Sequence, residues 1–93
     1  MEFKKATKSD LSYIIELLAN DELGSQREAF RLPLPESYET AFEKIVNDPN
    51  QELIVVKLNN KVIGTLQLSF IQYLTYQGGI RAQIEAVRIH EDE

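Results

Sequence analysis

Three strand-like segments separated by two turn signals occupy the second half of this sequence, and they restrict the fold more than any other feature. Residues 52–58, 61–73 and 80–89 are rich in β-branched and other apolar residues. Asn59-Asn60 separates the first two segments, and asparagine tolerates the left-handed backbone of a two-residue hairpin turn. Tyr76-Gln77-Gly78-Gly79 separates the last two as a loop. The pattern predicts an antiparallel meander of three strands.

The first half predicts a short strand over residues 3–6 and then a capped helix. Thr7-Lys8-Ser9-Asp10 resembles a capping box, with Thr7 as N-cap and an acidic residue at the third helical position. Apolar residues between 11 and 18 then recur at the spacing of one buried helical face, and Asn20-Asp21 ends the helix.

Residues 23–34 lack a regular pattern, although Arg27 and Arg31, four apart, would share one side of a short helical turn. Pro35 suits the first position of a second helix, because its missing N–H has no helical partner there. Apolar residues between 38 and 46 form an amphipathic stripe, and Asp48-Pro49-Asn50 ends the helix.

The predicted order of elements is therefore β-α-α-β-β-β. The fold class is α+β, with a mostly antiparallel sheet that two helices cover on one face. A chain of 93 residues is long enough for one small domain and too short for two, so residues 1–93 are assigned to a single domain.

The last predicted strand contains a change of parity. Apolar residues occupy the even positions from 80 to 86 and then positions 87 and 89, while Arg88 is polar. A β-bulge near Ala86–Val87 would produce this one-residue slip. A strand buried on both faces would produce the same pattern. Bulges are over-represented beside active sites, so this strand is a place to look for chemistry.

The composition excludes several classes of function. The chain has no cysteine, which excludes disulfides and thiolate catalysis, and no set of metal ligands is visible. The formal net charge is -5, whereas binding to the nucleic-acid backbone requires a surface rich in lysine and arginine. Nucleic-acid binding is therefore not expected. The longest apolar run is far shorter than the ~20 residues that span a bilayer. No secretory signal is visible, and we expect a cytoplasmic location without nucleic-acid or membrane partners.

In their order and spacing, these segments resemble the GNAT superfamily of N-acetyltransferases. Family members open with phrases such as Lys5-Ala6-Thr7-Lys8-Ser9-Asp10-Leu11. Residues 52–56 and 61–68 look like the second and third strands of the family, and residues 81–89 look like the fourth. The resemblance covers the whole chain and corresponds to the N-terminal half of the GNAT fold, which implies a truncated domain.

The resemblance implies an acetyl-CoA site at the bulge. In the family, backbone groups there pair with the pantetheine arm and polarise the thioester carbonyl, which assigns these roles to Ala86, Val87, Arg88 and Ile89. A glycine-rich loop and a helix N-terminus then hold the pyrophosphate in the family, and no such loop is visible here. The acidic residues 91–93 would repel a diphosphate. We expect weak or absent affinity for acetyl-CoA and an inactive isolated chain.

The resemblance also singles out side chains. Glu85 is the candidate catalytic base, because many relatives have a glutamate at this place that removes a proton from the amine, directly or through water. The alternative is a solvated carboxylate paired with Arg81 or Lys61. Candidates for the acceptor cleft, by the regions that form it in the family, are Arg27, Phe30, Tyr73 and Tyr76. Their alternatives are core or loop packing for the aromatic residues and solvation for the arginine.

Two functions remain open. The resemblance implies transfer of an acetyl group from acetyl-CoA to a primary amine of a small molecule or a peptide. The alternative is a non-catalytic fragment or interaction module that forms a homodimer through residues 80–89, because an open apolar strand edge pairs readily with another chain. The only histidine, His90, is expected to be solvated in the terminal tail.

Overall fold

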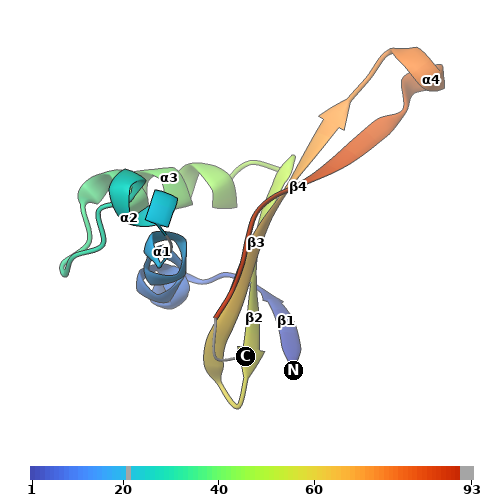
Figure 1. The fold of residues 1–93 in the computed structure, drawn as a ribbon. Helices are drawn as coiled ribbons and strands as arrows, with labels where there is room; N and C mark the ends of the chain where they lie inside the picture. The colour runs from blue at the N-terminus through green and yellow to red at the C-terminus, as the bar shows by residue number, and fades with distance from the viewer. Residues whose placement is uncertain (21, 91–93) are drawn as a thin grey trace.

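The computed structural model describes residues 1–20 and 22–90. Four strands of the described chain form one antiparallel sheet in the order β1-β2-β3-β4 (Figure 1). The elements are β1 (Glu2–Lys5), the 3-10 turn η1 (Lys8–Asp10), α1 (Leu11–Ala19), α2 (Glu22–Arg27), α3 (Glu36–Val46), β2 (Gln51–Leu58), β3 (Lys61–Gln72), α4 (Thr75–Gly78) and β4 (Ile80–Ile89). The predicted α+β class and antiparallel meander are confirmed.

The first helix begins with the cap that the sequence predicts. Thr7 has an extended backbone, and its N–H and hydroxyl donate to the Asp10 carboxylate at 2.9 and 3.1 Å. The turn η1 separates this cap from α1. Because Asp10 is only 4% exposed, its carboxylate satisfies donors that the buried helix start would otherwise leave unpaired.

A short helix, α2, lies in the stretch that shows no regular sequence pattern, so the expected irregular structure was wrong for residues 23–27. Its six residues include the buried Gly24 and are too few to show an amphipathic period. The helix packs against α1. The Ala29 N–H that follows it donates to the Tyr38 hydroxyl at 2.9 Å. Tertiary contacts of this kind leave no periodic signal in the sequence.

The second predicted helix, α3, begins one residue later than expected. Pro35, with a ψ of 139°, is its N-cap and not its first helical residue. The Pro35 carbonyl accepts the Tyr38 N–H at 3.1 Å. Glu36 and Glu39 lie in the first turn, where the helix dipole favours carboxylates. Phe42 is the buried residue of the predicted stripe.

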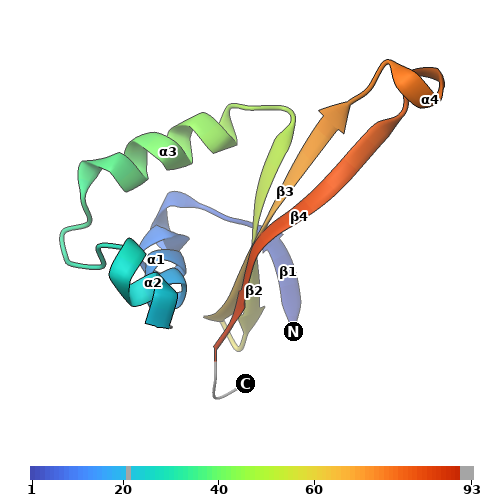
Figure 2. The same ribbon diagram turned by 45° about the horizontal axis from the view of Figure 1, so that its top comes forward.

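Helices α1, α2 and α3 lie on one side of the sheet, which we call the inner face (Figures 1 and 2). Leu11 and Ile15 of α1 and Phe42 of α3 form a buried cluster, and Leu53 of β2 packs against it. Val55, two residues further along β2, is fully buried. The core is therefore a single layer between the helices and the inner face.

The opposite side of the sheet, which we call the outer face, has no helix over it among the residues that the structure describes (Figure 2). Side chains alternate along each strand, and residues paired across strands share a face. The register therefore places these residues on the outer face: Phe3, Lys5, Glu52, Ile54, Val56, Leu66, Leu68, Phe70, Gln72, Ile80, Ala82, Ile84 and Ile89.

Both hairpins turn through left-handed residues. Asn59 and Asn60 have φ angles of 52° and 65°, which confirms the predicted two-residue turn. The expected loop between β3 and β4 contains the single turn α4, in which Tyr76 and Gln77 have φ angles of 54° and 57°. Residues 70–82 lie beyond the last pair of β3 with β2 and form an arm that projects from the body (Figures 1 and 2).

Candidate active site

Strand β4 contains the irregularity that its sequence predicts. Arg88 pairs with Thr65 and Glu85 pairs with Gln67, so three steps along β4 oppose two steps along β3. Ala86, inside this interval, has a φ of 52°. The prediction of a β-bulge near Ala86–Val87 is confirmed. The alternative, a strand buried on both faces, was wrong because β4 is exposed along most of its length.

The bulge places Glu85 and Arg88 on the same face. In a regular strand, residues three apart point to opposite faces. Here their partners Gln67 and Thr65 are both inner-face positions, and Gln67 lines a hollow with α1 and α3. Gln67 also donates to Gln51 Oε1 at 2.6 Å. A carboxylate and a guanidinium therefore flank the bulge on the side of the sheet where the helices lie.

Glu85 itself is exposed, one residue before the bulge. Its carboxylate accepts a hydrogen bond from the Gln83 side-chain amide at 2.9 Å. Within residues 1–20 and 22–90 it forms no ion pair with Arg81 or Lys61, the partners that the solvated alternative named. The carboxylate is therefore held by a neutral neighbour and is open to an incoming molecule.

The backbone of residues 86–89 runs along the edge of the sheet. Val87 and Ile89 are 49% and 57% exposed, and Arg88 Nη1 donates to the Val87 carbonyl at 2.8 Å. Gly64 lets β3 approach this segment closely, since a Cβ there would lie 2.9 Å from Ile89 Cδ1 and 3.1 Å from the Arg88 carbonyl oxygen. Among the described strands, β3 is the sole neighbour of β4. The segment therefore presents one backbone edge away from β3.

The four candidates for the acceptor cleft fall into two groups. Tyr73 and Tyr76 lie on the arm and line a hollow of about 280 Å³, where the Arg81 guanidinium sits 5.3 Å from the centre of the Tyr73 ring. Arg27 ends α2, and Phe30 follows it in the connection to α3. The arm tip and α2 are well separated in both views (Figures 1 and 2). The structure does not bring the two groups together.

The connection between α2 and α3 contains charged contacts that the sequence pattern did not reveal. Arg27 Nε lies 2.9 Å from Glu28 Oε2, and the Tyr38 hydroxyl donates to Glu28 Oε1 at 2.8 Å. These two hydrogen bonds, helped by the charges of Arg27 and Arg88, hold the pKa of Glu28 below its usual value against the effect of burial. The Arg88 charge is the smallest of these influences on Glu28.

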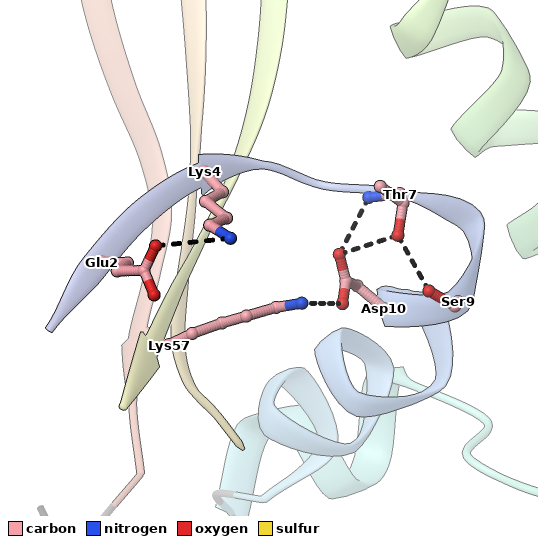
Figure 3. Close-up of polar contacts among 6 residues, drawn as sticks. All are labelled: Glu2, Lys4, Thr7, Ser9, Asp10 and Lys57. Atoms are coloured by element: carbon pink, nitrogen blue, oxygen red, sulfur yellow. Dashed lines mark hydrogen bonds and ion pairs between the residues drawn. The ribbon is translucent and has the colours of Figure 1, made fainter. Parts of the chain in front are cut away.

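Figure 3 shows a second polar cluster, in which Lys57 of β2 reaches the start of the helical segment. Lys57 Nζ lies 3.1 Å from Asp10 Oδ1, and the two side chains are 24% and 5% exposed. Burial is the largest single influence on Asp10 and raises its pKa. The Thr7 N–H, Lys57 and the Thr7 hydroxyl together outweigh burial, and the net pKa is lowered. The ion pair joins the helix cap to the sheet and is structural.

The expectation that His90 is solvated in a tail was wrong. Its N–H donates to the Ile63 carbonyl at 2.6 Å, which extends the contact with β3 past the end of β4. The residue is half-buried and lines a hollow of about 440 Å³ with Tyr13 and Glu16 of α1 and with Lys61. The expected repulsion of a diphosphate by residues 91–93 lies outside the described residues.

Two classes of feature are missing from the described ranges. No group of three or more histidine, cysteine, aspartate or glutamate side chains in residues 1–20 and 22–90 is placed to hold a metal ion. In the same ranges, every helix is too short or too polar to cross a membrane.

Comparison with known proteins gives the family. Residues 17–93 match the model of the acetyltransferase (GNAT) family. No curated protein matches the sequence. Among solved structures, a transcriptional regulator from Bacillus halodurans C-125 is 46% identical with a TM-score of 0.93, over 98% of this chain and 61% of that protein.

More distant structures share the fold. The glucosamine-6-phosphate N-acetyltransferase of Arabidopsis thaliana is 20% identical with a TM-score of 0.75, over 98% of this chain and 60% of that one. A protein from Clostridium acetobutylicum, described as a predicted acetyltransferase with acetyl-CoA, is 17% identical with a TM-score of 0.65, also over 98% and 60%. The chain thus spans about 60% of the length of these relatives. Because the family model matches most of the sequence, the chain belongs to the GNAT family of acetyltransferases.

Proposed function

We propose that this chain carries part of an N-acetyltransferase active site, with acetyl-CoA as the acyl donor and a primary amine as the acceptor. The observation that carries the proposal is the β4 bulge, which puts Glu85 on the inner face directly beside the exposed edge of residues 86–89. Family membership supports the reaction class. One similar structure is described as containing acetyl-CoA, which supports this donor. Another is a glucosamine-6-phosphate N-acetyltransferase, which supports an amine acceptor.

The residues present fit part of acetyl-CoA. Ala86, Val87, Arg88 and Ile89 belong to a strand that pairs with β3 on one side only among described strands, and such an edge suits the amide groups of a pantetheine arm. When bound, acetyl-CoA supplies an acetyl group activated as a thioester. No described helix begins after β4 to hold a diphosphate at its N-terminus. We therefore propose millimolar affinity or weaker, and little or no turnover, for the chain by itself.

Glu85 is the proposed base. Its carboxylate would accept the proton that the amine nitrogen loses, and the Gln83 amide, 2.9 Å away, orients that carboxylate. Arg88 shares the inner face with Glu85, so the bulge is flanked by one positive and one negative side chain. Arg27 and Phe30 stay proposed acceptor contacts from the α2 side, and Tyr73 and Tyr76 from the arm.

Backbone NMR tests the donor site. Titration of the 93-residue chain with millimolar acetyl-CoA should shift the amide signals of residues 86–89 more than those of β1 at the far edge of the sheet. Inorganic pyrophosphate is the matched control and should leave residues 86–89 unshifted, because no described helix N-terminus lies there to bind it. Shifts of other strands without shifts at residues 86–89 would rule the donor site out.

Release of the CoA thiol in the presence of an amine tests Glu85. If the chain turns over at all, Glu85→Gln should lower the rate by about 10²- to 10⁴-fold. Glu52→Gln is the control, because Glu52 is a strand carboxylate on the outer face. Acetyl-CoA affinity should be the same in both variants. Equal rates in the two variants would remove Glu85 from the mechanism.

The cytoplasmic location stays a prediction.

The second candidate function is self-association through the edge of β4. The favouring observation is that β4 is a ten-residue edge strand among the described strands, with Ile80 and Ile84 67% and 62% exposed. Edge pairing would make the outward N–H groups of β4 hydrogen-bond to a second chain. Amide hydrogen exchange should then slow at alternate residues of β4 as protein concentration rises. Concentration-independent exchange would contradict edge pairing.

A further inference from the structure

A hollow of about 150 Å³ lies between α1, α3 and the inner face of the sheet. Its walls include Ile15 and Leu18 of α1, Phe42 and Ile45 of α3, and Leu53 of β2. Ile15 and Phe42 are only 4% and 7% exposed, so the deep part of the hollow is enclosed by elements that pack against one another within this chain.

The polar atoms around the hollow already have hydrogen-bond partners elsewhere. Tyr38 and Gln67 are the lining residues with polar side chains. The Tyr38 hydroxyl donates to Glu28 Oε1 at 2.8 Å and accepts the Ala29 N–H at 2.9 Å. The Gln67 amide donates to Gln51 Oε1 at 2.6 Å. The hollow therefore presents mainly carbon, and an apolar cavity of about 150 Å³ with such walls stays dry and binds a molecule the size of benzene.

The hollow adjoins the proposed base. Gln67, one of its walls, is the cross-strand partner of Glu85. Paired residues of an antiparallel sheet have Cα atoms about 5 Å apart, and their side chains share a face. Since a primary amine is a cation at neutral pH, as in lysine, the exposed Glu85 carboxylate complements an ammonium group. The site therefore pairs a negative charge with a neighbouring apolar hollow.

We propose that the hollow binds the side group of the acceptor, and that the acceptor is a primary amine with an alkyl or aryl group about the size of benzene. This inference rests on the proposed function, because it takes Glu85 as the base that meets the amine. Burial of the apolar group would hold the nitrogen near that carboxylate, which is the positioning that acetyl transfer needs. A sugar amine fits less well, since its hydroxyl groups would lose their hydrogen bonds with water in an apolar hollow.

Methyl NMR on the 93-residue chain, labelled at isoleucine and leucine and free of acetyl-CoA, tests the proposal. Phenethylamine should shift the methyl signals of Ile15, Ile45 and Leu53 more than those of Ile80 and Ile84, which lie on the outer face of β4. Ethylamine is the matched ligand without the ring. It should bind at least about 10-fold more weakly, because it buries far less apolar surface. Glucosamine should bind no better than ethylamine.

Three variants separate the hollow from the charge. Ala41 lines the hollow and is exposed, so a leucine there would reach across its mouth, whereas its exposed neighbour Thr40 does not line it. Ala41→Leu should weaken phenethylamine binding about 10-fold or more, and Thr40→Leu should leave it unchanged. Glu85→Gln should weaken phenethylamine binding about 2- to 5-fold and leave the binding of benzene unchanged. Circular dichroism should show the same fold in all three.

Equal affinities for phenethylamine and ethylamine would overturn the proposal, as would equal effects of Ala41→Leu and Thr40→Leu. Wild-type affinity of Glu85→Gln for phenethylamine would overturn it too, because the amine would then not meet that carboxylate. The donor site is measured separately, at the amides of residues 86–89 with acetyl-CoA. Failure of this inference can therefore be distinguished from failure of the proposed function.

Discussion

The Asp10 carboxylate is held as an anion by groups from two parts of the chain. The Thr7 N–H and hydroxyl come from the helix cap, and the Lys57 ammonium comes from β2. Removing one partner of a buried pair leaves the other without compensation, which costs far more than loss of an exposed pair. The chain contains an exposed pair nearby, Glu2 with Lys4 at 3.3 Å, with side chains 59% and 53% exposed (Figure 3).

Asp10→Asn should lower the free energy of unfolding by about 1–3 kcal/mol, because charge-assisted hydrogen bonds to a buried group are lost. Glu2→Gln should lower it by less than about 0.5 kcal/mol, as is usual for exposed pairs. Urea unfolding at neutral pH, followed by circular dichroism, measures both. Equal effects of the two substitutions would contradict the importance given to burial.

The effect of Asp10 should depend on pH in a defined direction. Its pKa is lower in the folded chain than the ordinary value of 3.8, so its contribution is fully present well above pH 3.8 and is lost as the pH falls through the folded pKa. The stability difference between wild type and Asp10→Asn should therefore shrink in acid. Urea unfolding repeated from neutral pH into acid measures it, and a difference that stays constant would refute the assignment.

At the scale of elements, the bulge in β4 decides where its side chains point. It changes the parity of the strand, so Glu85 and Arg88 both reach the inner face. Its backbone requires the left-handed φ of 52° at Ala86. An L-residue in that conformation costs about 1–2 kcal/mol, and glycine avoids this cost.

Ala86→Gly should be neutral or stabilise the fold by up to about 1 kcal/mol, because relief of the left-handed strain offsets the entropy that glycine loses on folding. Ala82→Gly is the control. Ala82 lies in the regular part of the same strand, where glycine costs about 0.5–1 kcal/mol. Thermal unfolding of both variants gives the comparison. Similar losses at the two positions would mean that β4 has no bulge in solution.

At the scale of the whole molecule, the buried residues lie in the body of the sheet and not in the projecting arm. Val55, Val56 and Ile63 are among the least exposed residues and lie near the middle of the sheet. The arm has no helix packed on either face within the described chain (Figures 1 and 2). Its tip turns through consecutive left-handed residues, including Tyr76 and Gln77, neither of which is buried. Segments with few buried apolar contacts open locally without global unfolding.

Amide hydrogen exchange should therefore divide β3 into two parts. Amides near Ile63 and Thr65 should exchange on the order of 100-fold more slowly than those of residues 71–81, because the former require near-global opening. Mass spectrometry or NMR under native conditions measures the ratio. Protection of the arm equal to that of the sheet centre would show that something covers the arm in solution.

The sequence by itself determined the four strands, helices α1 and α3, and the order of these six elements. Local rules were enough for the cap at Thr7, the turn at Asn59-Asn60 and the bulge near Ala86, because each depends on a few neighbouring residues and on side-chain parity. The resemblance to the GNAT family rests on the same short sequence segments, and the family model confirms it. Helix α2 escaped this reasoning because its six residues are held by contacts with α1 and not by a pattern of their own.

The tertiary structure decided which face of the sheet each residue shares and which distant residues meet. Parity along β4 shows that Ile84 and Glu85 point to opposite sides, but only the packing of α1 and α3 on Leu53 shows which side is covered. The Asp10–Lys57 ion pair and the separation of Phe30 from Tyr76 also depend on long-range packing. Burial is a property of the assembled layers, and a sequence pattern of period two cannot say on which side the second layer lies.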